Sequence, residues 1–256
     1  MAGSGFGTNF RITTWGETHG AGVGVVVDGC PAGLPLERED VQKYLDRRKP
    51  GQSKYTTQRK EGDQVEILSG IFEGRTTGTP ISMVVYNKDQ RSKDYSNIKD
   101  IYRPGHADFT FDMKYGFRDY RGGGRSSGRE TIGRVAAGAV AAKVLKELGI
   151  EIKAYAKAIA GIEVSKDHFD FAEMNNNPFN MPDKEAAKLV QEKADQMIKE
   201  MDSIGGIIEC QITGMPVGIG ETVFDKLDAE LSKAIMSIGS VKGFEIGDGF
   251  EAANLR

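Results

Sequence analysis

The chain has 256 residues, of which 39% are hydrophobic and 28% are charged, a composition that is ordinary for a globular protein with a sizeable core. Its 34 basic and 37 acidic residues leave a net charge of −3, and this argues against a nucleic-acid binder, which usually carries a basic excess. The N-terminus lacks the basic start and apolar run of a signal peptide, and no apolar stretch approaches a membrane span. We therefore expect a cytoplasmic protein without a membrane partner.

Short apolar runs, several of them alternating with polar residues, predict strands, and amphipathic stretches with clear stop signals predict helices. In chain order, the predicted strands are residues 10–15, 23–28, 64–68, 81–86, 150–164 and 206–213. The predicted helices are residues 36–48, 128–148, 183–201 and 225–238. Residues 87–108 and 167–182 are predicted as polar loops. Strands and helices mixed in this way indicate an α+β fold.

One pattern occurs twice. Residues 29–34 (GCPAGL) and 214–219 (GMPVGI) both fit G-x-P-x-G-[LI], and each lies between a predicted strand and a predicted helix. Two similar turns would explain this, but a strand–turn–helix unit used twice favours an internally pseudo-duplicated fold. The two cysteines, Cys30 and Cys210, lie in apolar, strand-like surroundings, which predicts buried free thiols and no disulfide or zinc site.

Residues 121–130 (RGGGRSSGRE) concentrate arginine, serine and glycine just before a predicted helix. The spacing of Ser127 and Glu130 predicts a capping box, so the glycine-rich part would lie at a helix N-terminus, where free N–H groups favour anions. The arginines of this box, whose planar side chains suit phosphate or carboxylate, are Arg121, Arg125 and Arg129.

Familiar nucleotide motifs do not fit this box. No Gly-Lys-Ser/Thr follows it, as a Walker phosphate loop requires, and no apolar strand precedes it, as a Rossmann turn requires. An RGG-type RNA segment would be repeated, whereas the box occurs once. The remaining alternative is a surface loop whose arginines are paired with Asp119 and Glu130.

Two of the histidines lie in glycine-rich contexts. His19 is in WGETHG and His106 in RPGHAD, whereas His168 lies in a polar loop and is expected to be solvated. A histidine beside glycine is accessible to a ligand, and it can donate a proton to a phosphate or another developing anion. Arg103 precedes His106, and a further basic cluster covers residues 47–49 with Lys54. Together they predict a pocket for a small polyanion with general-acid assistance.

Several long blocks of the chain resemble chorismate synthase. The first signature of that family matches GETHGAGVGVVVDGCPAG, and the second matches GGGRSSGRETIGRVAAGA. The stretches DRRKPGQSKYTTQRKEGDQVEILSGIFEGRTTGTPI, YRPGHADFTFDMKYGFRDYRGG and AIMSIGSVKGFEIGDGF are also similar to the family. The resemblance covers essentially the whole chain.

The resemblance implies a 1,4-anti elimination that converts 5-enolpyruvylshikimate 3-phosphate to chorismate and phosphate. It implies reduced FMN as the cofactor, with NADPH as a candidate flavin reductant, and a homotetramer. It also implies a β-α-β sandwich, with helices layered between antiparallel sheets. The alternatives are a flavin-dependent oxidoreductase acting on a phosphorylated small molecule and, less favoured, an RNA-binding protein.

The resemblance also implies roles for individual residues. His19 would protonate or stabilise the leaving phosphate, and His106 would lie by the flavin and tune its protonation. The residues that resemble substrate contacts are Arg48, Lys54, Arg103, Ser127 and Arg129. The residues that resemble flavin contacts are Arg125, Ser126, Ser127, Gly239 and Ser240.

The chain departs from the family pattern in three places. Thr18 replaces the usual serine and keeps a hydroxyl, and Lys54 replaces a commoner arginine, which removes bidentate phosphate contact. The family's third signature, built on Arg-x-Asp, finds no match in these residues. We therefore expect residues 1–256 to form a single chorismate-synthase-like domain that is C-terminally incomplete.

Overall fold

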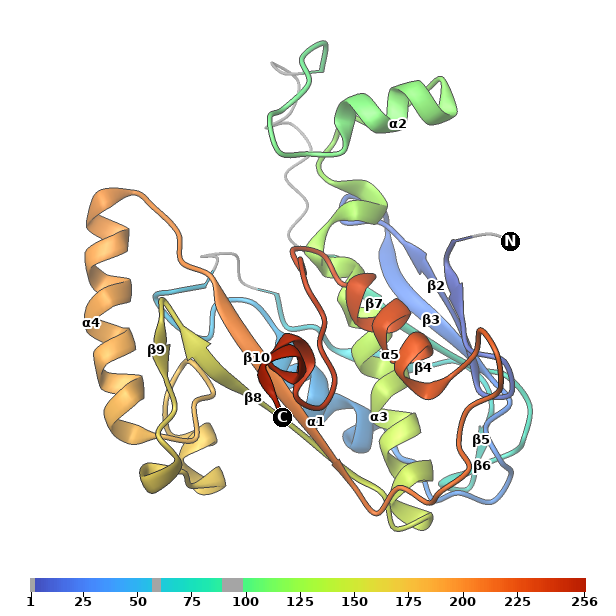
Figure 1. Ribbon diagram of the computed structural model, residues 1–256. Helices are drawn as coiled ribbons and strands as arrows, with labels where there is room; N and C mark the ends of the chain where they lie inside the picture. The colour runs from blue at the N-terminus through green and yellow to red at the C-terminus, as the bar shows by residue number, and fades with distance from the viewer. Residues whose placement is uncertain (1–2, 57–60, 89–98) are drawn as a thin grey trace. The chain divides into compact units, whose positions relative to one another are not determined.

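The computed structural model describes residues 3–56, 61–88 and 99–256 (Figure 1). The chain divides into two compact units. The larger contains Met1–Lys49, Glu61–Val144 and Pro216–Arg256, and the smaller contains Pro50–Lys60 and Leu145–Met215. None of the described helices is long and apolar enough to cross a membrane.

The larger unit is built on a five-stranded sheet with strand order β1-β2-β3-β7-β4. Its strands are β1 (Gly5–Phe6), β2 (Arg11–Gly16), β3 (Gly22–Asp28), β7 (Ile81–Tyr86) and β4 (Val65–Ile67). Every pairing in it is antiparallel, with Val25 of β3 opposite both Thr14 of β2 and Met83 of β7. A separate hairpin joins β5 (Ile71–Phe72) to β6 (Arg75–Thr76).

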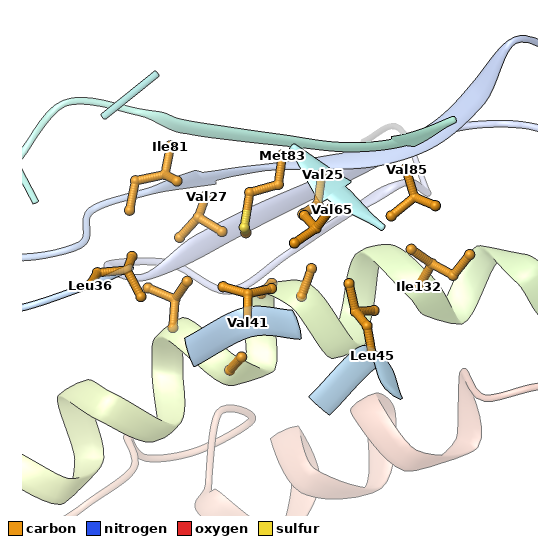
Figure 2. Close-up of a cluster of buried hydrophobic side chains, with 14 of the residues drawn as sticks. Val25, Val27, Leu36, Val41, Leu45, Val65, Ile81, Met83, Val85 and Ile132 are labelled. Atoms are coloured by element: carbon orange, nitrogen blue, oxygen red, sulfur yellow. The ribbon is translucent and has the colours of Figure 1, made fainter. Parts of the chain in front are cut away.

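Two helices, α1 (Arg38–Arg48) and α3 (Thr131–Glu147), cover one face of this sheet (Figure 2). Val41 and Leu45 of α1 and Ile132 of α3 are at most 1% exposed and lie between their helices and the sheet. Each such side chain stabilises the fold by about 1.5–3 kcal/mol through burial alone. This layer fixes where the first turn of α3 meets the sheet. That turn follows residues 121–130 (RGGGRSSGRE), the arginine–glycine box.

The other helices of the larger unit are α2 (Asp108–Tyr115) and α5 (Leu227–Met236). The smaller unit has a three-stranded antiparallel sheet of β10 (Gly206–Thr213), β8 (Glu151–Ile159) and β9 (Ile162–Glu163), in that order. Its helix α4 (Lys184–Glu200) buries Ala186, Ala187 and Val190 in a second apolar cluster with Ala156 of β8. Short 3-10 helices lie at Gly124–Ser126, Gly128–Glu130, Lys166–His168, Phe171–Asn175 and Gly249–Asn254.

Antiparallel sheets combined with helices confirm the predicted α+β class, and most elements lie where the sequence predicts them. One predicted strand is wrong: residues 150–164 are not continuous, because Ala160 and Gly161 have φ of 54° and 78° and turn β8 back onto β9. Helix α2 was not predicted. Cys30 is buried as expected, but Cys210 is exposed, as are most residues of β10.

The two copies of the repeated sequence pattern, residues 29–34 and 214–219, also share a backbone geometry. The first and fifth positions of each copy are left-handed glycines, with φ of 80° at Gly29, 82° at Gly33, 75° at Gly214 and 88° at Gly218. In each copy the first glycine lies against the carbonyl that precedes the neighbouring strand, Asn9 before β2 and Gly149 before β8. The repeated geometry supports an internally pseudo-duplicated fold.

Alanine substitutions at the two glycines of the first copy distinguish the cost of a steric clash from the cost of a left-handed backbone. A Cβ at Gly29 would collide with the carbonyl oxygen of Asn9, whereas a Cβ at Gly33 would meet nothing within 4 Å. We expect Gly33→Ala to destabilise the protein by about 1–2 kcal/mol, through the left-handed φ alone, and Gly29→Ala by roughly 3 kcal/mol or more. Urea unfolding of both variants measures this, and equal losses would contradict the steric account.

Candidate active site

The two signature loops meet at His19. The loop after β2 carries His19, and the loop before α3 carries Gly122, whose φ is 93°. A Cβ at Gly122 would lie 2.7 Å from Nε2 of His19, so the glycine backbone packs directly on the imidazole. The expectation that glycine neighbours leave this histidine accessible is wrong, because His19 is only 8% exposed. Its burial comes from the glycine loop lying on it.

Beside these loops, one buried carboxylate holds two arginines. Oδ1 of Asp63 lies 3.1 Å from Nη1 of Arg129, and Oδ2 lies 2.6 Å from Nη1 of Arg48. The side chain of Asp63 is fully buried, and that of Arg129 is 6% exposed. Burial lowers the pKa of Arg48; Asp63 opposes this effect, and the neighbouring positive charge of Arg129 adds to it. The sequence therefore brings together two of the arginines predicted to bind the substrate.

Asn87, which follows β7, connects this pair to the His19 loop. Its Oδ1 accepts a hydrogen bond from Nε of Arg129 at 3.1 Å. Its Nδ2 donates to the carbonyls of Glu17 and Gly20, at 2.9 Å each. The turn that carries His19 and the guanidinium of Arg129 are thus positioned by the same amide.

Two buried polar atoms of this cluster lack partners within residues 3–56, 61–88 and 99–256. They are Nη2 of Arg129 and Oγ1 of Thr18. A buried polar group without a partner costs roughly 1–3 kcal/mol, and such groups gather where a ligand completes the hydrogen bonding. The donors suit an anionic oxygen, so the residues fit a phosphate- or carboxylate-bearing ligand.

The turn that carries His106 is held by buried ion pairs. Asp108, at the start of α2, accepts from Nε and Nη2 of Arg103 at 2.8 Å each, and it lies 3.2 Å from Nη1 of Arg118. Hydrogen bonds from Arg103 hold the pKa of Asp108 well below its usual range, with a smaller contribution from the charge of Arg118. Arg103 also donates to the carbonyl of Gly122 at 2.9 Å, which ties this turn to the His19 loop.

His106 is exposed, as its sequence context predicts. Its Nδ1 lies 3.0 Å from the carbonyl oxygen of Pro104. Since a carbonyl only accepts, a hydrogen bond here requires a proton on Nδ1 and leaves the Nε2 lone pair for a ligand. The third histidine, His168, is exposed on the smaller unit, as predicted.

Within the arginine–glycine box, the two terminal nitrogens of Arg125 bond to the protein. It donates to the carbonyls of Gly16 and Thr14 and to Oγ1 of Thr14, and it lies 3.6 Å from Glu130. Asp119 and Arg121 form an ion pair at 2.6 Å. This pair lowers the pKa of Asp119, and the charge of His19 lowers it further by a smaller amount. For Arg121 and Arg125, the predicted alternative of arginines paired with Asp119 and Glu130 is therefore correct.

The capping box predicted at Ser127 and Glu130 is wrong. Oγ of Ser127 accepts from the N–H of Arg129, and residues 124–130 form two 3-10 turns before α3 begins. The carboxylate of Glu130 accepts from Oγ1 of Thr14 and from Nε of Arg134, at 2.7 and 2.8 Å, and so ties the helix start to β2. Ser126 donates its hydroxyl to the carbonyl of Gly123.

Gly239 and Ser240 follow α5 in an exposed turn, with a φ of 72° at Ser240. The guanidinium of Arg134 on α3 donates to Oγ and to the carbonyl of Ser237, at 2.6 and 3.2 Å. These bonds attach the turn to the first part of α3, the helix that also follows the arginine–glycine box.

Lys54 belongs to the smaller unit and already has a partner. Its Nζ lies 2.7 Å from Asp195 of α4, which also accepts from the hydroxyl of Tyr55 at 2.9 Å. Hydrogen bonds to Asp195 and Tyr55 raise the pKa of Lys54. Contact of Lys54 with a phosphate stays a prediction.

Comparison with known proteins identifies the family. The family model described as chorismate synthase matches residues 10–256. The chain belongs to the chorismate synthase family. A relative from Lachnospira eligens described as chorismate synthase is 71% identical, over 100% of this chain and 70% of its own length. Another, from Chloroflexus aurantiacus, is 58% identical over the same shares of the two chains.

A solved structure titled "Crystal Structure of Chorismate Synthase" is similar, with a TM-score of 0.78 at 32% identity, over 97% of this chain and 72% of that one. The likeness confirms the α+β fold. The function is that of the family, a carbon–oxygen lyase of aromatic amino acid biosynthesis acting on a small molecule, and membership implies a flavin cofactor.

The contact between Gly122 and His19 can be tested with two alanine variants. Gly122 and Gly124 both have positive φ, but a Cβ at Gly124 would meet only Phe111, at 4.0 Å. We expect Gly122→Ala to displace the imidazole and lower turnover on the order of 100-fold, with a clearly smaller loss for Gly124→Ala. Phosphate release measures both, and equal losses would show that backbone strain, not the His19 contact, is responsible.

The ion pairs of Asp108 predict an acid dependence of stability. Because its folded-state pKa is depressed, Asp108 contributes stability that is present above its ordinary pKa and is lost as the pH falls below it. We expect Asp108→Asn to cost roughly 1–3 kcal/mol at pH 7, with the gap to wild type narrowing below about pH 4.

Urea unfolding between pH 7 and pH 3 measures this gap. Asp28→Asn is the control. The ion pair of Asp28 with Arg11, whose nitrogen and oxygen are 3.5 Å apart, is exposed to solvent, and such a pair stabilises the fold by less than about 1 kcal/mol. A gap for Asp108→Asn that stays constant with pH would contradict the assignment.

Proposed function

We propose that the elimination of phosphate from 5-enolpyruvylshikimate 3-phosphate, which gives chorismate, takes place at the cluster formed by His19, Gly122, Arg48 and Arg129. The observation that carries this proposal is the buried guanidinium of Arg129, whose Nη2 has no acceptor within the described residues. A buried cation with an unmet donor is a site prepared for an anionic oxygen.

The charges of the cluster support an anionic substrate. Arg48 and Arg129 share one buried carboxylate, that of Asp63, which leaves an excess of one positive charge in a desolvated place. The substrate carries a phosphate and two carboxylates, and these would supply the missing negative charge. Arg103 and Ser127, which border the same loops, would contribute further donors.

The two histidines would handle protons at different places. His19, packed under Gly122, would donate to or stabilise the oxygen of the departing phosphate, because developing negative charge there needs a fixed donor. His106, with Nδ1 oriented by the carbonyl of Pro104, would present Nε2 towards the flavin and hold or accept a proton there.

For the cofactor, we propose reduced FMN. Bound here, it would supply the electron transfer that makes the elimination feasible without net oxidation. The residues proposed to hold it are Arg125, Ser126, Ser127, Gly239 and Ser240. Arg125 would act by shaping the loop, since its guanidinium donates to β2, whereas the exposed backbone and hydroxyl groups of Gly239 and Ser240 are available to a ligand.

Three further properties of the family are proposals for this chain: a homotetrameric assembly, a cytoplasmic location, and NADPH as the flavin reductant. We also propose that residues 1–256 act as one domain despite their two compact units. One family model spans residues 10–256, which supports this.

The function is tested by phosphate release, without oxygen, from 5-enolpyruvylshikimate 3-phosphate with reduced FMN. We expect phosphate and chorismate in equal amounts, and we expect His106→Ala to lower turnover at least roughly 100-fold. His168→Ala is the matched control, because His168 is also exposed but lies in the smaller unit. Release that consumes NADPH in step with turnover would indicate an oxidoreductase, and near-wild-type turnover of His106→Ala would remove its role.

A further inference from the structure

We propose that Asp63 is a positioning residue for the substrate: its buried carboxylate fixes the guanidinium of Arg129 so that one N–H edge faces the substrate's anionic group. Asp63 would touch no reacting atom and would act only through Arg129 and Arg48. The inference rests on the proposed function, because it assumes that Arg129 binds the substrate.

Asp63 is held in place independently of the arginines. Gln42 of α1 donates from Nε2 to the carbonyl of Asp63 at 3.1 Å, and its Oε1 accepts from the N–H of Val65 at 3.0 Å. This amide clamps the residues just before β4 onto α1. Asp63 has a left-handed φ of 43° and is 2% exposed. The carboxylate is therefore a rigid fixture of the larger unit.

The carboxylate of Asp63 is shared between two cations. Each oxygen takes one arginine, Oδ1 from Arg129 and Oδ2 from Arg48. Two buried guanidinium groups would otherwise repel each other at low dielectric. The carboxylate between them keeps both charged side chains in one place without neutralising the pair.

The contacts of Arg129 also fix the direction of its remaining donor. A guanidinium is planar, so fixing two of its nitrogens fixes the third. Nε of Arg129 donates to Asn87 and Nη1 to Asp63, and Nη2 is the nitrogen for which the described residues supply no acceptor. The direction of this free donor is consequently set by Asp63 and Asn87.

The variant that isolates this role is Asp63→Asn. Asparagine has the same shape, tolerates a left-handed φ, and removes only the charge and one acceptor. Its amide NH₂ would face one of the two guanidinium groups, donor against donor, and would turn it away. We expect the affinity for 5-enolpyruvylshikimate 3-phosphate, measured by calorimetry without flavin, to fall on the order of 100-fold. In turnover assays KM should rise by a similar factor with little change in kcat, the pattern of lost uniform binding.

The chain offers a matched control in Asp183→Asn. Asp183 is also 2% exposed, but it accepts only from backbone N–H groups: Oδ1 from Glu185 and Ala186 at the start of α4, where asparagine caps equally well, and Oδ2 from Ser165. We expect this variant to bind the substrate like wild type, whatever its change in melting temperature. In an Arg129→Met background, Asp63→Asn should cost clearly less affinity than it does alone, because its effect passes through Arg129.

The outcomes are distinguishable. If Asp63→Asn lowers the melting temperature but leaves the affinity and KM unchanged, Asp63 is only structural and the inference is wrong. If Asp63→Asn does not fold, Asp63→Glu keeps the charge but shifts it by one methylene, and unchanged affinity in that variant overturns the inference. If the wild-type protein neither binds nor converts the substrate, the proposed function fails, and the inference fails with it.

Discussion

The close approach of α3 to β2 and β3 is the constraint on which the site depends. A Cβ at Gly133 would lie 3.0 Å from the carbonyl of Gly24 and 3.0 Å from Cγ2 of Thr14, so a larger residue would force the helix and the sheet slightly apart. Glu130 and Arg125, at and before the helix start, bond to the same Thr14. The helix start cannot move without breaking contacts to the sheet, and the arginine–glycine box is carried with it.

This anchoring divides the box into residues that build it and residues that are left for chemistry. The guanidinium of Arg125 donates to carbonyls of β2, and Arg121 is paired with Asp119. Arg129, by contrast, is buried, and the described part of the chain supplies no acceptor for its Nη2. Similar residues, a few positions apart, therefore have different roles. Neither the number of arginines nor their spacing decides which of them can serve a ligand; the surrounding acceptors decide it.

Much of the fold could be predicted from the sequence because its signals are local. Short apolar runs, several of them alternating, located β2, β3, β4 and β7 of the larger sheet but not the two-residue β1, and stop signals located the ends of α1 and α3. The failures have equally local causes. The strand after α3 carries a run of apolar residues straight through Ala160 and Gly161, so its pattern hides the turn. The predicted capping box matched in sequence, but Glu130 was drawn to Thr14, 116 residues away, by a hydrogen bond that no local rule contains.

The candidate site shows the same division at a finer scale. Residue type and glycine context indicated the histidines and arginines as candidate site residues, but nothing in the sequence indicated Asp63 or Asn87. Each is an unremarkable polar residue beside a strand, and each gains its importance from partners in distant segments: Asp63 bonds to an arginine 66 residues away and Asn87 to a carbonyl 70 residues away. A single sequence lists the groups that can bind an anion. The packing that brings these segments together determines which arginines share a carboxylate. It also determines the direction of the remaining N–H donor of Arg129.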